Sequence, residues 1–426
     1  MVRAEPTGST PNPGPAGRRP GAPAAEERSP HARGAPLTPG DPLASVGAAS
    51  PTDAAPLHPI QAAAWGAAIA TLPIYFFSSG QPQPTDWVLA VLAPVALLGS
   101  ARSRAPGTLR SAGVLALFVA VVVAVNAVWL ELTGSHDFVT TTLFYVFNLL
   151  VFTGAGVMAE AHGPAFARVV AWAAGVSLVA HVAAAFAFPA LELSGRLHLF
   201  TNNPNQLAYA SLGLASLVFV AARVAAVPQW LPLVAATAAG FLIFRTYSRA
   251  ALLALGTLAL VALVRRPALV LVLALPLLVG GLAIGDDLAE DELLRERFSA
   301  VAEGGLEDYV EDRGIQRVLD HPEYLIAGAG EGAHGRFHPL GLELHSSFAS
   351  VAFSYGVLGV IALGAFVVVL VRGGEGRTAL LLAPVALYGA FHNGMRFRVL
   401  WILLACAGAA IVGEARARGQ PARAGP

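Results

Sequence analysis

The chain has 426 residues, of which 55% are hydrophobic and 13% are charged. A mean hydropathy of +0.62 excludes an ordinary soluble domain and indicates an integral membrane protein. The formal net charge is zero, so the sequence predicts no nucleic acid partner, and the single cysteine, Cys406, excludes an internal disulfide.

Residues 1–58 differ from the rest of the chain, because they are rich in Pro, Ala and Gly and contain no long apolar run. Such a composition buries too little apolar surface to offset the conformational entropy lost on folding. The segment also lacks the apolar core of a signal peptide. We therefore expect a disordered cytoplasmic tail, either without a specific role or acting as a partner-binding arm.

From Ile60 onward the sequence is a series of apolar runs separated by short polar stretches. A membrane-spanning helix needs roughly 20 apolar residues, and continuous runs exclude the alternating strands of a membrane barrel. The sequence thus predicts an all-α integral membrane protein with a membrane domain at residues 59–413 and about 12 transmembrane helices. They lie near residues 60–78, 84–100, 111–131, 139–159, 165–189, 205–226, 228–245, 249–264, 267–285, 346–371, 378–393 and 396–413.

The arginines predict how these helices are oriented. One alternate set of gaps between them contains Arg102, Arg104, Arg110, Arg168, Arg223, Arg265, Arg266, Arg372 and Arg377. The C-terminal tail, residues 414–426, adds Arg416, Arg418 and Arg423. Because arginines collect on the cytoplasmic side, both termini are expected there. The chain is then a multi-pass protein of the cell inner (plasma) membrane.

This orientation makes residues 285–344 one long extracytoplasmic loop between helices 9 and 10. The loop carries fifteen acidic and five basic residues, which suits a translocated segment. Its acidic cluster is interpreted as a solvated face, with a divalent cation site as the alternative, so we predict no metal. The cluster comprises Asp286, Asp287, Glu290, Asp291 and Glu292.

Five arginines lie in the opposite, outer set of short gaps and do not help orientation: Arg196, Arg245, Arg249, Arg396 and Arg398. Each lies next to the end of a predicted helix. A guanidinium there can simply reach the headgroup region. The alternative is a functional site, because ionisable groups near hydrocarbon are costly and the guanidinium fork binds phosphate.

Short polar motifs in the outer gaps also have two interpretations. Asn203 suits the N-cap of a helix that begins at Pro204, and the alternative is that Asn203 and Asn205 face an anionic ligand. The run Gly328-Ala329-Gly330-Glu331-Gly332 predicts a tight turn at the membrane face, since no βαβ unit supports dinucleotide binding. His181, inside an apolar run, is interpreted as a packed core histidine.

His345 lies where the acidic loop meets the tenth predicted helix, either as a functional group or as an interfacial residue that caps this helix, and Ser346 behind it can also supply the N-cap. In order along the chain, these pieces resemble the O-antigen ligase and O-antigen polymerase superfamily over about residues 195–366. The pieces are Arg196 before Asn203-Pro204-Asn205, Ser248-Arg249, the long loop, Arg313 before Gly328-Ala329-Gly330, and His345 followed by Gly356 and Gly359. Two positions depart from the family pattern, because Ser346 replaces a frequent Asn and Ala250 a frequent Gly.

The resemblance implies a membrane glycosyltransferase in cell-surface polysaccharide assembly, either a ligase or a polymerase. Its donor would be a polyprenyl-pyrophosphate-linked glycan, its acceptor a glycan or lipid-glycan hydroxyl, and its surroundings membrane lipids, without a cofactor. His345 would be the catalytic base, because its ordinary pKa suits proton transfer at neutral pH. Residues expected to bind the donor pyrophosphate are Arg249, Arg196 and Arg313, with possible support from Arg245, Asn203 and Asn205.

Two other functions stay open at the level of sequence. A transporter or flippase of lipid-linked sugars shares the number of helices and the need to bind a lipid phosphate. Transporters, however, usually show internal repeats and polar sites near the middle of the bilayer, whereas here the charges collect at the outer edge. A catalytically inactive scaffold is the third possibility.

Overall fold

A computed structural model describes residues 56–78, 80–99, 105–188, 191–193, 195–263, 313–338, 341–374 and 376–419. All of them belong to one compact unit, Gly47–Pro426. This part of the chain is mostly helical, with one small antiparallel pair of strands, β1 (Glu192–Leu193) and β2 (Arg196–Leu197). The predicted ninth helix, the first part of the long loop and the predicted disordered tail up to residue 55 lie outside the described residues.

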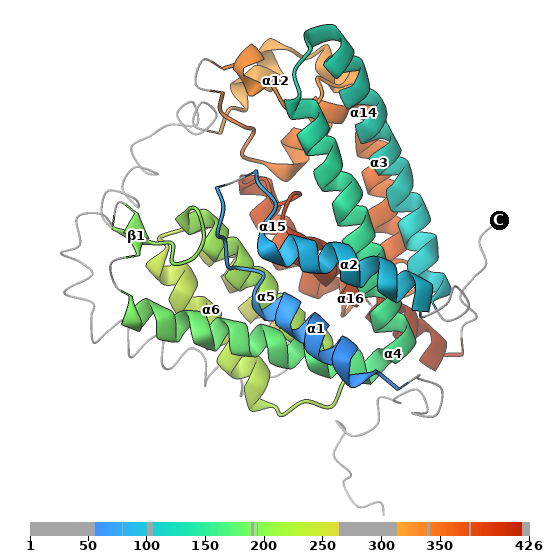
Figure 1. Cartoon of the computed structure of the whole chain (residues 1–426), viewed down its shortest axis with the longest axis vertical. Coiled ribbons are helices and arrows are strands. Elements are labelled where there is room, and N and C mark those ends of the chain that lie inside the picture. The colour runs from blue at the N-terminus through green and yellow to red at the C-terminus, as the bar shows by residue number, and fades with distance from the viewer. Residues whose placement is uncertain are drawn as a thin grey trace, which may run out of the picture. The chain divides into compact units, whose positions relative to one another are not determined.

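Most of the longer helices coincide with predicted apolar runs, but α1 ends at Ala70 instead of 78, and the run 378–393 forms a 3₁₀ turn and a nine-residue helix (Figure 1). They are α1 (Pro59–Ala70), α2 (Pro84–Gly99), α3 (Pro106–Thr133), α4 (Asp137–Ala187), α5 (Pro204–Val224), α6 (Trp230–Arg245), α7 (Arg249–Leu263), α14 (Ser347–Val371), α15 (Ala383–Phe391) and α16 (Arg398–Ala417). Shorter elements are α12 (Gln316–Asp320), α13 (Tyr324–Ala327), and the 3₁₀ turns η1 (His334–Arg336) and η2 (Ala379–Leu382).

Five of the described helices are long and apolar enough to cross a membrane: α3, α4, α5, α14 and α16. The chain is therefore a helical, membrane-embedded protein. Two predicted runs, 139–159 and 165–189, are joined in α4, which spans 51 residues. A break at Gly163, with φ of 39°, divides it, and Pro164 begins the second half where its missing N–H costs least.

The first half of α4 packs closely against its neighbours because glycines face them. A Cβ at Gly154 would come within 2.5 Å of Ala93 in α2, and one at Gly156 within 2.5 Å of Thr108 in α3. Small residues at such points let helix backbones approach each other, which strengthens packing where no water is present. The first half of α4 is therefore packed closely against α2 and α3.

A second break, at Gly356 in α14, positions the glycine-rich turn after α13. Gly356 has φ of 61°, and a Cβ there would lie 2.3 Å from the Ile326 carbonyl oxygen. The break leaves the Phe353 and Ser354 carbonyls to accept hydrogen bonds of 2.9 Å each from the N–H groups of Ala329 and Gly330. The tight turn predicted at residues 328–332 is thus present, and it is joined to the backbone of α14.

Three aromatic rings, one from each of α3, α4 and α14, lie next to this turn. Phe118, Tyr145 and Tyr355 pack edge to face, with ring centroids 5.7, 5.8 and 5.8 Å apart. All three side chains are fully buried. Both tyrosine hydroxyls point toward the glycine-rich turn, and this arrangement favours a hydrogen-bond acceptor there.

Candidate active site

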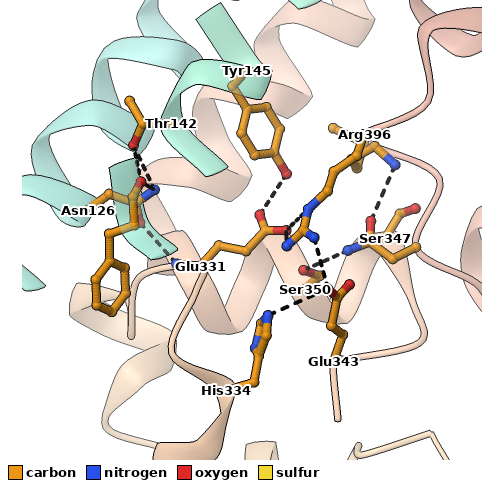
Figure 2. Close-up of polar contacts among 12 residues, drawn as sticks. Asn126, Thr142, Tyr145, Glu331, His334, Glu343, Ser347, Ser350 and Arg396 are labelled. Carbon is orange, nitrogen blue, oxygen red and sulfur yellow. Dashed lines mark hydrogen bonds and ion pairs between the residues drawn. The ribbon is translucent and has the colours of Figure 1, made fainter. Parts of the chain in front are cut away.

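The loop that follows α15 contacts the start of α14, at the end of segment 313–346. Ser347, the first residue of α14, donates its N–H and its hydroxyl to the His392 carbonyl, at 3.3 and 3.1 Å. The Ser347 hydroxyl also accepts from the Gly394 N–H at 2.9 Å (Figure 2). The loop after α15 is therefore bound to the beginning of α14, and His392 is brought close to His345.

His345 is half-buried and does not cap α14. The Ser346 hydroxyl fills that role by accepting from the Ala349 N–H, which confirms Ser346 as a cap. The N–H of His345 instead donates to the Arg313 carbonyl at 3.1 Å, and its Nδ1 lies 2.9 Å from the Glu343 carbonyl. Since a carbonyl only accepts, Nδ1 carries the proton and Nε2 holds the lone pair.

Arg313 lies between the two histidines. Its Nη1 donates to the Phe391 carbonyl at 2.6 Å and lies 3.3 Å from Nε2 of His392. The His345 and His392 rings have centroids 6.3 Å apart, and His392 stacks on Tyr388 at 4.8 Å. Two imidazoles and a guanidinium from three distant segments therefore share one small region.

The electrostatic setting keeps both rings neutral at neutral pH. Burial, followed by the positive charge of Arg313, lowers the pKa of His345 below its ordinary value. Burial lowers the pKa of His392 to about 3, and Arg313 again adds to the effect. A neutral imidazole with a free Nε2 lone pair can accept a proton, which is what a general base requires.

Arg196 and Asn205 are connected to the same region through Tyr388. Arg196 donates from Nε to the Thr246 carbonyl at 2.8 Å and from Nη2 to the Asn205 side-chain oxygen at 3.1 Å. The Asn205 carbonyl accepts from the Tyr388 hydroxyl at 3.0 Å. Because Tyr388 stacks on His392, these contacts link four of the predicted residues: His345, Arg313, Arg196 and Asn205.

Of the three other predicted residues, Arg249 lies beside this region, whereas Arg245 and Asn203 have different partners. Arg249 begins α7 directly after the buried Ser248, which lies next to Tyr388. Arg245 donates from Nη2 to Glu192 at 2.5 Å, within a partly exposed ion pair beside the small β-hairpin. The Asn203 side chain accepts from the Gln206 N–H at 3.0 Å, which confirms it as the N-cap of α5.

A second polar cluster surrounds Glu331 of the glycine-rich turn. Figure 2 shows its carboxylate between Tyr145 and Arg396. Tyr145 and Tyr355 donate to Oε2 at 2.8 and 2.7 Å, while Nε and Nη2 of Arg396 donate to Oε1 at 2.9 and 2.7 Å. The Glu331 N–H also donates to Asn126 at 2.9 Å, so backbone and side chain are both fixed.

The same Arg396 reaches a second carboxylate. Its Nη1 donates to Glu343 at 2.8 Å, and Nε2 of His334 lies 3.9 Å from the same Glu343 oxygen (Figure 2). Burial raises the pKa of Glu331, but Arg396 and the tyrosine hydroxyls outweigh it, so that this pKa lies below its usual range. Glu331 is therefore ionised, and Arg396 bridges two carboxylates.

Sequence reasoning missed His392, Tyr388 and Glu331 as members of the site. The sequence offers a signal for His392, because this residue begins the polar segment His392-Asn393-Gly394-Met395-Arg396, and Arg396 is one of the arginines assigned to the outer gaps. For Glu331 the sequence predicts only a place in the turn at residues 328–332. For Tyr388, inside an apolar run, no sequence signal marks the hydroxyl that contacts Asn205, 183 residues away.

The remaining histidine and metal predictions concern the rest of the chain. His181 is buried in α4, with Nδ1 2.7 Å from the Ser177 carbonyl, as a packed core histidine should be. Within the described ranges, no group of three or more His, Cys, Asp or Glu side chains could hold a metal ion. The acidic cluster at 286–292 lies outside those ranges.

The site thus combines a neutral imidazole with a free Nε2 lone pair, two guanidiniums and a second imidazole. Such a set can accept a proton on one side while fixed N–H donors stabilise negative charge on the other. A scan against models of known protein families finds no match to this chain, and a search of curated proteins finds no relative.

Proposed function

We propose that the protein is a membrane glycosyltransferase that moves a glycan from a polyprenyl-pyrophosphate donor to an acceptor hydroxyl at the outer membrane face. It would act in cell-surface polysaccharide assembly, as a ligase or polymerase resembling the O-antigen superfamily. One observation carries the proposal: His345, Arg313 and His392 come from three separate segments and lie together, and Arg196 is linked to His392 through Asn205 and Tyr388. The topology that goes with it has about twelve helices, cytoplasmic termini and an outer loop at 285–344.

The proposed chemistry assigns one task to each side of the site. Nε2 of His345 takes the proton of the acceptor hydroxyl as its oxygen bonds to the anomeric carbon. The bond from that carbon to the pyrophosphate oxygen breaks, and the lipid pyrophosphate leaves with the electron pair. Guanidiniums of Arg196, Arg313 and Arg249 stabilise that charge without a metal.

The direct test measures transfer by the purified protein with a lipid-linked donor. His345→Ala should lower turnover by roughly 10² or more, because a positioned base contributes about 10²–10⁴, while donor binding persists. His321→Ala, a partly exposed histidine in the same segment, is the matched control. Transfer at the wild-type rate by the His345 variant would remove the base from the proposal.

A second test addresses the donor side. Arg249→Lys keeps the positive charge but loses the planar fork, so it should still weaken donor binding and turnover. The protein should remain in the membrane at its normal level. Unchanged donor binding in Arg249→Ala would show that Arg249 only anchors the start of α7.

The sidedness of the loop is tested separately. A reporter fused at Glu307 should be accessible only from outside, because the arginine distribution assigns the loop to that face. Labelling from the cytoplasm would reject the whole topology, and with it an outer-face reaction.

One structural feature favours the second candidate, a transporter or flippase of lipid-linked sugars. Both α4 and α14 are interrupted, at Gly163 and Gly356, and transporters often use discontinuous helices around their sites. The break at Gly356, however, is occupied by the turn at Ala329 and Gly330. A transporter would move labelled donor across vesicles without joining it to an acceptor, so the transfer assay separates the two functions.

A further inference from the structure

Glu343 contacts two functional parts of the site with two different atoms. Its backbone carbonyl lies 2.9 Å from Nδ1 of His345, and its carboxylate accepts from Nη1 of Arg396 at 2.8 Å. The carboxylate is half-exposed, so a single ion pair would hold it only weakly in water. The position of the Glu343 carboxylate therefore depends on how firmly the Nε and Nη2 atoms of Arg396 are held.

Arg396 is held by a buried anchor. The Glu331 side chain is 1% exposed, and it accepts from both Nε and Nη2 of Arg396. Glu331 itself is fixed by the hydroxyls of Tyr145 and Tyr355, which come from two helices. A two-pronged, charge-assisted contact in a buried place has little freedom to rearrange, so Nη1 of Arg396 is presented to Glu343 in a fixed direction.

His334 also approaches the Glu343 carboxylate, with Nε2 3.9 Å from Oε1, but this is too long for a hydrogen bond, and the remaining contacts of residues 341–346 hold the backbone. The Leu342 carbonyl accepts from Arg317, and the His345 N–H donates to the Arg313 carbonyl. These bonds lie on either side of Glu343. Arg396 therefore supplies the side-chain contact that keeps the Glu343 peptide aligned with the imidazole between them.

We propose that Glu331 and Arg396 are a positioning pair, which acts through Glu343 to hold His345 with its proton on Nδ1 and its lone pair on Nε2. This inference rests on the proposed function, in which His345 is the base. In the transfer step Nε2 receives the acceptor proton, and the ring becomes an imidazolium with both nitrogens protonated. The Glu343 carbonyl then accepts a stronger, charge-assisted bond from Nδ1 as the positive charge forms.

The charged and titratable groups around His345 fix the sign of the pH effect. Arg313 and Arg317 disfavour the protonated ring, while the Glu343 carbonyl and carboxylate favour it, and the neighbouring imidazole is His392. Removing the Glu343 side chain deletes the charge and frees the carbonyl, so the pKa of His345 should fall further. Since the base works only when neutral, the acidic limb of the turnover profile should move to lower pH.

The experiment compares Glu343→Ala with Glu323→Ala, an exposed glutamate of the same outer segment. Glu343→Ala should lower kcat by roughly tenfold or more, because small displacements of a reacting group cost up to about 10², with donor Kd unchanged. It should also shift the acidic limb downward. Glu323→Ala should leave kcat, Kd and the profile as in the wild type.

Arg396→Lys provides a second variant, because it keeps the charge that neutralises Glu331 but cannot reach both carboxylates with a fork. It should reproduce the kcat loss of Glu343→Ala but not its downward shift of the acidic limb, because the Glu343 charge that favours the protonated ring remains. The combined variant should then be no worse than either alone, since both break the same chain of contacts. Additive losses in the double variant would overturn the positioning role.

A spectroscopic measurement separates this inference from the proposed function. In protein with ¹⁵N-labelled histidine, the signal lost in His345→Ala identifies His345, and its two nitrogen shifts report which atom carries the proton. The wild type should show Nδ1–H, and Glu343→Ala a mixture of both tautomers. An unchanged Nδ1–H form in Glu343→Ala overturns the inference whatever the transfer assay shows. A tautomer change together with full transfer by His345→Ala would reject only the catalytic base.

Discussion

Arg396 and Arg398 lie two residues apart, and each binds a carboxylate, but their surroundings differ. Nη1 of Arg398 donates to both oxygens of Asp86 at 2.6 Å, and the two side chains are 9% and 8% exposed. Arg396 is 24% exposed and joins the buried Glu331 to Glu343, which is 45% exposed. Arg398 and its partner are therefore both buried, whereas Arg396 has one buried partner and one half-exposed partner.

The difference shows that the partner, and not the place in the sequence, decides what an arginine at a helix end does. The Arg398–Asp86 pair joins the start of α16 to the first turn of α2, so it serves to hold helices together. The Arg396 cluster ends at the residue whose carbonyl orients His345. Variants that remove or replace each pair should therefore have different consequences.

The largest effect on stability is expected for Arg398→Ala. It leaves the Asp86 carboxylate buried without its main cationic partner, and breaking a buried pair costs about 3–5 kcal/mol. Thermal unfolding in detergent should show the loss. The double variant Arg398→Met with Asp86→Leu should recover part of it, because an apolar pair of similar volume replaces the ion pair, while the buried Gln83 N–H loses its acceptor on Asp86. A double variant as unstable as the single one would mean that the hydrogen bond from Gln83, and not the ion pair, accounts for the loss.

Glu331→Gln should have a smaller effect on stability but a larger one on turnover. The amide keeps an oxygen for Arg396 yet loses the charge, and it presents N–H groups to hydroxyls that now donate to a carboxylate. We expect a loss of about 1–3 kcal/mol, the usual cost of leaving buried polar groups imperfectly paired. Turnover should fall as in Glu343→Ala. If stability falls while kcat and its pH profile stay normal, the cluster is a structural anchor like Arg398.

Acidification should weaken the Arg396 cluster in a predictable direction. The pKa of Glu331 is lowered in the folded protein, so its ionised form contributes stability above the unfolded value, near 4.3. That contribution is lost as the pH falls through the lower folded pKa. The thermal midpoint of the wild type should therefore drop more steeply below about pH 4.3 than that of Glu331→Gln. Parallel curves would show that Glu331 does not change its protonation on unfolding.

The sequence predicted local features well, because they depend on neighbouring residues. Most helix positions, the N-caps at Asn203 and Ser346, the packed His181 and the turn at residues 328–332 follow from short-range chemistry, whereas the early end of α1 at Ala70 does not. The break at Gly163 falls in the gap predicted between residues 159 and 165, whereas the break at Gly356, inside the predicted helix 346–371, was not predicted. Glycine occurs often in such helices, and only the tertiary contacts of Gly356 show why its backbone must turn.

The partners of the arginines could not be predicted, because they lie far away in the chain. Arg398 meets Asp86 across 312 positions, and Arg396 meets Glu331 across 65. In the sequence both arginines, and Arg245 with them, show the same pattern of a cation at the end of an apolar run. Which carboxylate is buried beside each one depends on how the helices pack, and this information is not local.

The smallest effect is expected for Arg245→Ala, and it extends the comparison to an open pair. Its guanidinium and the Glu192 carboxylate are 37% and 29% exposed, so water and salt screen the attraction. The expected loss of stability is about 0–1 kcal/mol, and it should shrink at high salt. Because the side chain is directed to Glu192, donor binding should stay within about twofold of the wild type, which is roughly 0.4 kcal/mol.

Glu192→Ala is the matched variant, since it removes the other half of the pair and leaves the arginine in place. If Arg245→Ala weakens donor binding while Glu192→Ala does not, the guanidinium contacts the pyrophosphate when donor is bound, and Arg245 belongs with Arg196 and Arg313.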